Sequence, residues 1–172
     1  GENYVSLAID SALRQTYDNI EVIVINDGST DNTDKICKSY KNKIKYIKKE
    51  NGGVSTALNV GIRNMSGDYF SWLSHDDLYY PEKVETEIEY LRKNNLFNTD
   101  TIICSNHSFI DEHGFKGPDI KYDSSFLNRD NAYFILKCAL SGITLLIPKH
   151  AFYKVSFFDE ESNCVQDYTL WF

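Results

Sequence analysis

Residues 20–31 have the sequence IEVIVINDGSTD, in which an apolar, β-branched run is followed at once by a polar stretch. Residues 20–25 (IEVIVI) predict a strand covered on both faces, because such strands show near-continuous apolar runs. Residues 27–31 (DGSTD) are of types that are common in turns and at helix N-caps. The stretch therefore predicts a buried strand, a tight turn and the start of a helix.

The rest of the chain continues this alternation of strands and helices. We expect helices over residues 5–13, 31–40, 55–65, 81–91 and 128–140, and strands over residues 44–48, 68–73 and 101–105. A hairpin turn is expected over residues 110–115, and a strand over residues 143–147 ended by Pro148. Alternating elements of this kind favour an α/β fold, here a three-layer α/β/α sandwich around a mostly parallel mixed sheet.

The composition sets limits on size, compartment and partners. A chain of 172 residues with 42% hydrophobic content is suited to one compact domain. Its net charge of −7 disfavours a nucleic-acid partner, because phosphate backbones are also negative. The four cysteines lie far apart without zinc-site spacing, so we expect reduced, buried thiols and a cytoplasmic setting. No apolar run is long enough to span a bilayer.

Seven lysines lie within residues 35–49. They are interpreted as a solvated face of a helix and a strand, or as a contact with an anionic partner or membrane. The second interpretation would allow peripheral association at the inner face of the membrane. No pattern in the sequence indicates an oligomeric state.

Polar clusters follow two of the predicted strands, at the carboxyl ends where α/β proteins bind ligands. The second cluster, residues 74–77 (SHDD), ends in the adjacent acids Asp76 and Asp77. Two neighbouring carboxylates repel each other, and a divalent cation with oxygen ligands, Mn²⁺ or Mg²⁺, would offset that repulsion. The alternative is an acidic N-terminal cap for the helix that begins near Pro81.

The first cluster contains Asp27, whose carboxylate could accept a hydrogen bond from a base or a ribose, or could cap a turn. A calcium loop is disfavoured, since its twelfth position is Lys38 rather than Glu and its sixth is Asn32 rather than Gly.

Taken alone, Asp167 is an acid at the start of a helix. No P-loop, GxGxxG or GxSxG motif occurs, which argues against P-loop NTPases, Rossmann dehydrogenases and serine hydrolases.

Seven segments occur in an order and spacing that are far more specific than any one of them. They are residues 11–17 (SALRQTY), 20–31 (IEVIVINDGSTD), 51–53 (NGG), 57–62 (ALNVGI), 67–69 (GDY), 72–77 (WLSHDD) and 166–168 (QDY). Together they resemble the inverting family 2 glycosyltransferases with the GT-A fold, across nearly the whole chain.

The resemblance implies a role for each matching residue. Asp27 corresponds to the acid that contacts the nucleotide base, and Gly53 lies where the chain passes close to the nucleotide. Asp76 corresponds to the first acid of the DxD-type motif, near the ribose. Asp77 corresponds to the ligand of the Mn²⁺ or Mg²⁺ ion held by the diphosphate. Asp167 corresponds to the general base that deprotonates the acceptor hydroxyl.

The implied activity is transfer of a sugar from a nucleotide-diphosphate sugar, by resemblance a UDP-sugar, to a sugar or lipid-linked acceptor. The transfer inverts the anomeric configuration, and the expected setting is cell-envelope polysaccharide biosynthesis. Two alternatives stay open. The chain could be a truncated, inactive nucleotide-binding module, or a nucleotidyltransferase that shares this sheet architecture.

The chain departs from the family pattern at three points. The family's opening strand, roughly VSVIxPxYN, is absent, so we expect a sheet that lacks its first strand, with an exposed edge or another segment in the gap. Ser74 replaces an acid, and Leu58 stands where many relatives have Arg. We expect one catalytic domain over residues 1–172, truncated at both ends, with a nucleotide-binding half (1–100) and an acceptor-side half (101–172).

Overall fold

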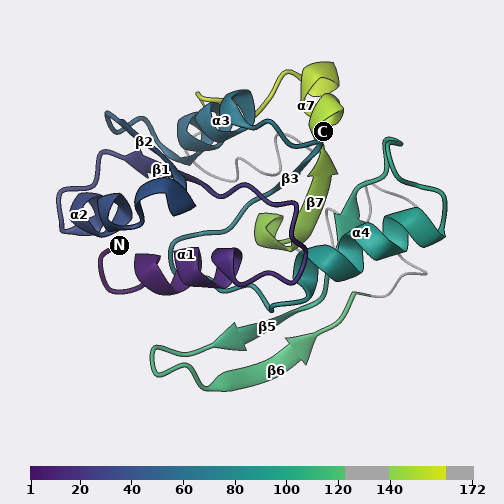
Figure 1. Ribbon diagram of the computed structural model, residues 1–172, viewed down its shortest axis with the longest axis horizontal. Coiled ribbons are helices and arrows are strands. Elements are labelled where there is room, and N and C mark those ends of the chain that lie inside the picture. The colour runs from purple at the N-terminus through teal and green to yellow at the C-terminus, as the bar shows by residue number, and fades with distance from the viewer. Residues whose placement is uncertain (123–139, 162–172) are drawn as a thin grey trace.

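The structure is a computed structural model that describes residues 1–122 and 140–161 (Figure 1). Its elements are α1 (Val5–Leu13), β1 (Ile23–Asp27), α2 (Thr33–Ser39), the 3₁₀ helix η1 (Lys41–Lys43), β2 (Lys45–Lys49), α3 (Val54–Asn64), β3 (Tyr69–Ser71), α4 (Lys83–Lys93), β4 (Ile103–Cys104), β5 (His107–Ile110), β6 (Lys116–Ile120), the 3₁₀ helix η2 (Gly142–Thr144), β7 (Leu145–Pro148) and α7 (Lys149–Val155). The predicted order of elements is confirmed for the described residues. The helix expected over residues 128–140 lies almost wholly outside them.

The first strand begins later than the sequence pattern predicted. β1 pairs in parallel with β2, from Ile23 opposite Lys45 to Asp27 opposite Lys49. Asp27 is therefore the last residue of the strand, whereas the sequence pattern assigned it to the turn. Register with β2 sets these bounds, and the apolar pattern alone does not contain that register.

A second group of strands is antiparallel. β7 lies between β3 and β4 and pairs antiparallel with both. Parallel and antiparallel pairing therefore both occur, as expected, but among the described strands only β1 and β2 pair in parallel, in a sheet of their own. The expected strand over residues 143–147 is displaced, because the Thr144 N–H and hydroxyl both donate to the Ser141 carbonyl and close a turn there. The strand ends at Pro148, as the sequence predicted: Pro148 is the last residue of β7 and lies opposite Tyr69 in an extended conformation.

Helices cover both faces of the strands and complete three layers (Figure 1). Val22, just before β1, and Val24 on it pack towards α1 and α2, whereas Ile23 packs towards α3. On β7, Leu146 packs against α4, and its neighbours Leu145 and Ile147 join the cluster formed with α3 and α7. The alternation of side chains along each strand thus distributes one core between two helical layers.

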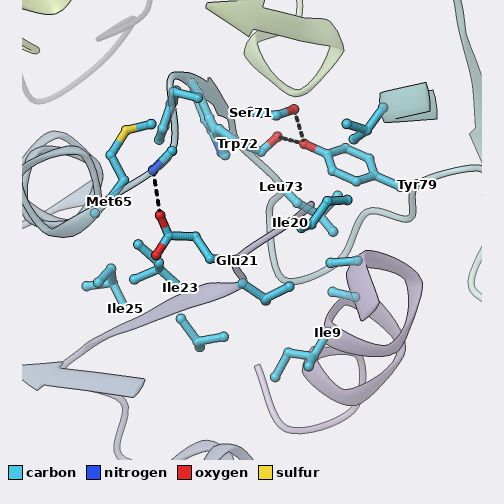
Figure 2. A pocket seen from close by; sticks show the side chains of 18 of the residues that line it. Ile9, Ile20, Glu21, Ile23, Ile25, Met65, Ser71, Trp72, Leu73 and Tyr79 are labelled. Atoms are coloured by element: carbon cyan, nitrogen blue, oxygen red, sulfur yellow. Dashed lines mark hydrogen bonds between the residues drawn. The ribbon is translucent and has the colours of Figure 1, made fainter. Parts of the chain in front are cut away.

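A cavity of about 980 Å³ lies between β1 and β3 (Figure 2). Within residues 1–122 and 140–161, β1 pairs with β2 and β3 pairs with β7, and no strand joins β1 to β3. The facing edges of these two strands agree with the expectation of a sheet that lacks one strand. As a result Ile23, Val24 and Ile25 are half-buried, where the sequence predicted a strand covered on both faces.

The β5–β6 hairpin projects from one side of the molecule (Figure 1). Its turn falls where the sequence predicted it, and the Asp111 carboxylate accepts hydrogen bonds from the His113 and Phe115 amides at 2.9 Å each. In the part of the chain that the structure describes, no helix is both long and apolar enough to cross a membrane.

Candidate functional site

Asp27 connects the carboxyl end of β1 to the loop that precedes α3. Its Oδ1 atom accepts a hydrogen bond from the Gly52 amide at 3.0 Å, and its Oδ2 atom accepts one from the Gly53 amide at 2.8 Å. The Lys49 ammonium also donates to Oδ1 and reaches Thr56 Oγ1 at 2.9 Å. The structure therefore brings together Asp27 and Gly53, two residues that the sequence singled out separately.

These donors keep the Asp27 carboxyl ionised. Its partial burial favours the neutral form, but hydrogen bonds from Lys49, Gly52 and Gly53, together with the charge of Lys49, outweigh that effect and lower its pKa. An ionised carboxylate acts as a hydrogen-bond acceptor only. Asp27 is thus suited to receive an N–H or O–H group from a ligand.

Two glycines allow the backbone geometry around Asp27. Gly28 and Gly53 have φ values of +75° and +86°, a region that side chains with a Cβ atom rarely adopt. A Cβ atom at Gly28 would also lie 2.7 Å from the Asn51 amide nitrogen. The two loops therefore approach each other closely at Gly28, whereas a Cβ atom at Gly53 would meet no other atom within 4 Å.

Asp76 and Asp77 lie in the loop that follows β3. The Asp77 amide donates to the Ser74 carbonyl at 3.3 Å, which folds the loop into a turn. The Asp76 side chain is 58% exposed, and its Oδ1 atom lies 3.7 Å from His75 Nδ1. Asp77 is half-buried. The two acids therefore differ in environment although they are adjacent in sequence.

Burial, and then the neighbouring Asp76 carboxylate, raise the pKa of Asp77, while Ser74 and the two histidines His75 and His107 oppose that shift. A carboxyl group in such a place gains from a nearby positive charge. His107 lies at the start of β5, so the base of the hairpin is close to this acid. Asp77 is therefore not in the environment of an ordinary solvated helix cap, and the helix that follows, α4, has Glu82 at its N-cap.

The carboxyl ends of β1 and β3 border the same cavity. Asn26, Asp27 and Ser29 line it from β1 and the turn after it, and Ser74 and His75 line it from the loop after β3. The structure thus places both loops at the rim of one cavity, although Asp76 and Asp77 themselves are not among the residues that line it.

The acids present are compatible with a divalent cation that takes some of its ligands from the protein and the others from a bound phosphate. Among the described residues, no group of three or more His, Cys, Asp or Glu side chains could hold a metal ion unaided. Mg²⁺ sites commonly use one or two carboxylates plus substrate phosphates and water. Asp77, with Asp76 beside it, fits that pattern and would hold the cation.

Some site residues follow from the sequence and others do not. Lys49 belongs to the lysine run that the sequence assigned to a solvated face or a membrane contact, yet its ammonium is paired with Asp27. No local signal distinguishes Lys49 from the other lysines of that run, because the register of β2 with β1 decides which of them lies opposite Asp27. Leu58, in the position of the family's Arg, packs against the apolar core. Asp167 lies outside the described residues.

The sequence was compared with models of known protein families and with curated proteins. The family model described as glycosyl transferase family 2 matches residues 1–161. An uncharacterized glycosyltransferase of Rickettsia typhi is 50% identical over 176 residues, which cover 100% of this chain and 54% of that protein. The chain spans about half the length, or less, of the first curated relatives that it matches.

Solved structures share the fold. The crystal structure of Staphylococcus aureus TarS 1-349 in complex with UDP has a TM-score of 0.72 and 20% identity, over 98% of this chain and 50% of that chain. The complex of the same protein with UDP-GlcNAc has a TM-score of 0.70 and 21% identity, over 98% of this chain and 49% of that chain. At this level of identity the similarity concerns the fold, which is that of a GT-A-type glycosyltransferase domain.

Proposed function

Because this chain belongs to glycosyl transferase family 2, we propose that it is the donor-binding part of an enzyme that transfers a sugar from a UDP-sugar. The observation that carries the proposal is the pairing of the Asp27 carboxylate with the Gly52 and Gly53 amides, beside the cavity that Ser74 and His75 also line. The TarS complexes with UDP and UDP-GlcNAc support a uridine nucleotide as the donor.

The proposed binding mode uses the two acidic loops for different parts of the donor. Asp27 accepts the N–H of the base, Gly53 lets the backbone approach the nucleotide, and Asp76 contacts the ribose. Asp77 would hold Mn²⁺ or Mg²⁺, and the bound cation would supply positive charge beside the diphosphate. The raised pKa of Asp77 supports this assignment, because a cation would relieve the cost of its partly buried charge.

The proposed reaction is a single displacement. The acceptor hydroxyl oxygen forms a bond to the anomeric carbon while the bond from that carbon to the diphosphate oxygen breaks. The hydroxyl proton passes to Asp167, which acts as the general base, and the nucleoside diphosphate leaves. Attack from the face opposite the leaving group inverts the anomeric configuration.

The acceptor is proposed to be a sugar or a lipid-linked acceptor, in the synthesis of a cell-envelope polysaccharide. A lipid-linked acceptor would require peripheral association with the inner face of the membrane. The lysines of residues 35–49 support such a contact in part. Lys38 and Lys48 are paired with Asp34, whereas Lys35, Lys41 and Lys43 lie on the exposed surface.

Substitution of Asp77 tests the assignment. Asp77→Ala is expected to lower Mn²⁺-dependent release of UDP from UDP-GlcNAc by about 100-fold, the usual scale for removal of one group that stabilises developing charge. The matched control is Asp18→Ala, which removes an exposed acid on the segment before β1. Unchanged release by the Asp77 variant would refute the role of Asp77.

The same assay separates the two alternatives. Release of pyrophosphate in place of UDP would favour a nucleotidyltransferase. Calorimetric binding of UDP with Mn²⁺, without any turnover of UDP-sugars, would favour a nucleotide-binding module.

A further inference from the structure

Tyr79 closes the segment 72–79, which carries both acids of the loop after β3. Its hydroxyl donates to the Trp72 carbonyl oxygen at 2.6 Å and lies 2.7 Å from the Ser71 hydroxyl (Figure 2). Its backbone N–H donates to Ser11 Oγ at 3.1 Å, which ties the end of the segment to α1. Tyr79 thus fixes the end of this segment to Trp72, its first residue, and to α1.

A buried ion pair on α4 in turn holds Tyr79. The Lys83 ammonium lies 4.6 Å from the centre of the Tyr79 ring and donates to Ser71 Oγ at 3.1 Å. It also donates to Glu87 Oε2 at 3.0 Å, and the other oxygen of Glu87 accepts a hydrogen bond from the Ser105 hydroxyl. The pair therefore links α4 to β3, to Tyr79 and to the segment after β4.

Burial of this pair is costly, and stability alone does not explain it. The Lys83 and Glu87 side chains are 9% and 3% exposed. Burial lowers the pKa of Lys83 and raises that of Glu87, and each charge opposes the shift of its partner. Apolar residues of similar volume often replace a buried ion pair without loss of stability, and in some proteins a buried charged pair selects one arrangement of its neighbours.

We propose that Tyr79 and the Lys83–Glu87 pair form a positioning unit that holds Asp77 in the orientation needed for a cation and a diphosphate. The inference rests on the proposed function of Asp77. None of the three residues needs to touch the ligand. Hydrogen bonds from Tyr79 and Lys83 to the Ser71 hydroxyl and the Trp72 carbonyl fix the start of the loop. Apolar side chains in their place would lack this directionality, and the loop could shift.

The test compares two variants that each remove one tyrosine hydroxyl. Tyr79→Phe removes the contacts to Trp72 and Ser71. Tyr40→Phe is the matched control, since the Tyr40 hydroxyl also has two partners, Asp10 at 2.9 Å and the Ser6 carbonyl at 3.1 Å, and it packs in the cluster below β1. Thermal unfolding of both variants measures the structural cost of losing such a hydroxyl.

Two readouts separate positioning from stability. Calorimetric UDP binding is followed across a Mn²⁺ titration, and amide hydrogen exchange is followed over residues 73–78. For Tyr79→Phe we expect about a tenfold rise in the Mn²⁺ concentration that gives half-maximal UDP binding, equivalent to about 1.4 kcal/mol. We also expect faster exchange over residues 73–78. Tyr40→Phe should change neither, even where its melting temperature falls equally.

The outcomes distinguish this inference from the proposed function. If the unaltered chain binds UDP with Mn²⁺ and Tyr79→Phe behaves like Tyr40→Phe, the positioning role is overturned and the function stands. If the unaltered chain shows no metal-dependent UDP binding, the proposed function is overturned, and the positioning role with it.

A paired substitution keeps the test sharp if Tyr79→Phe folds poorly. Lys83→Met together with Glu87→Met removes both charges and leaves no lone buried ion. We expect this variant to retain its melting temperature and to show the same rise in the Mn²⁺ requirement. An unchanged Mn²⁺ requirement in the paired variant would overturn the inference.

Discussion

Asp27→Asn isolates the charge of the residue that connects β1 to the loop before α3. Asparagine keeps one oxygen, which can still face Lys49 and Gly52, but it places an amide N–H₂ group against the Gly53 amide. A hydrogen bond to a charged group contributes about 1.5–3 kcal/mol. Asp27 and Lys49 are 21% and 22% exposed, so solvent screens the pair in part and the lower half of that range applies. We expect a loss of about 2 kcal/mol in the free energy of unfolding.

This loss should depend on pH in one direction. The pKa of Asp27 is lower in the folded chain than the unperturbed value of 3.8. A group with a depressed folded pKa stabilises the fold above its unfolded pKa, and that contribution disappears as the pH falls through the folded value. The difference in the free energy of unfolding between the unaltered chain and Asp27→Asn should therefore be largest at pH 7 and decrease below about pH 3.8.

Urea unfolding followed by tryptophan fluorescence at pH 7 and at pH 3 measures both effects. Asp111→Asn is the matched control, because the Asp111 oxygen that accepts two backbone N–H groups is retained in asparagine. We expect its loss to stay within about 0.5 kcal/mol at either pH. A loss for Asp27→Asn that is equal at pH 7 and pH 3 would refute the argument that an ionised Asp27 holds the two loops together.

Two further substitutions test contacts that shape the site. Asn59→Ala should lower the free energy of unfolding by about 2–6 kcal/mol in urea titrations, because the buried Phe158 N–H and C=O, at 3.0 and 2.9 Å from the Asn59 amide, both lose their partner; a loss below 1 kcal/mol would contradict that account. Gly142→Ala should cost about 1–3 kcal/mol, since a Cβ atom there would overlap the Trp72 ring, and an unchanged melting temperature would show that the ring can move away.

Much of the fold follows from local patterns in the sequence. The apolar run of residues 20–25 predicted a strand, and the polar stretch after it predicted the turn and helix that the structure shows as far as α2. The turn of the β5–β6 hairpin also falls where the sequence placed it. These predictions succeeded because hydrophobic periodicity and turn propensity act over a few neighbouring residues.

The bounds of the strands depend on their pairing partners, which local patterns in the sequence do not reveal. β7 begins at Leu145, where its pairing with Cys104 of β4 begins, whereas the apolar run predicted a strand from residue 143. β1 ends at Asp27 for the same reason, through its register with β2. Pairing between segments that are distant in sequence therefore decided each case.

The sequence by itself identified the acids Asp27, Asp76 and Asp77 as candidates, through their position after predicted strands and through the family pattern. The tertiary structure decided how they are held. Lys49, one lysine of a charged run in the sequence, is the partner of Asp27 in the structure. The buried Lys83–Glu87 pair lies next to the segment that carries Asp77. Such contacts depend on register and packing between segments far apart along the chain, and no local pattern of residue types contains that information.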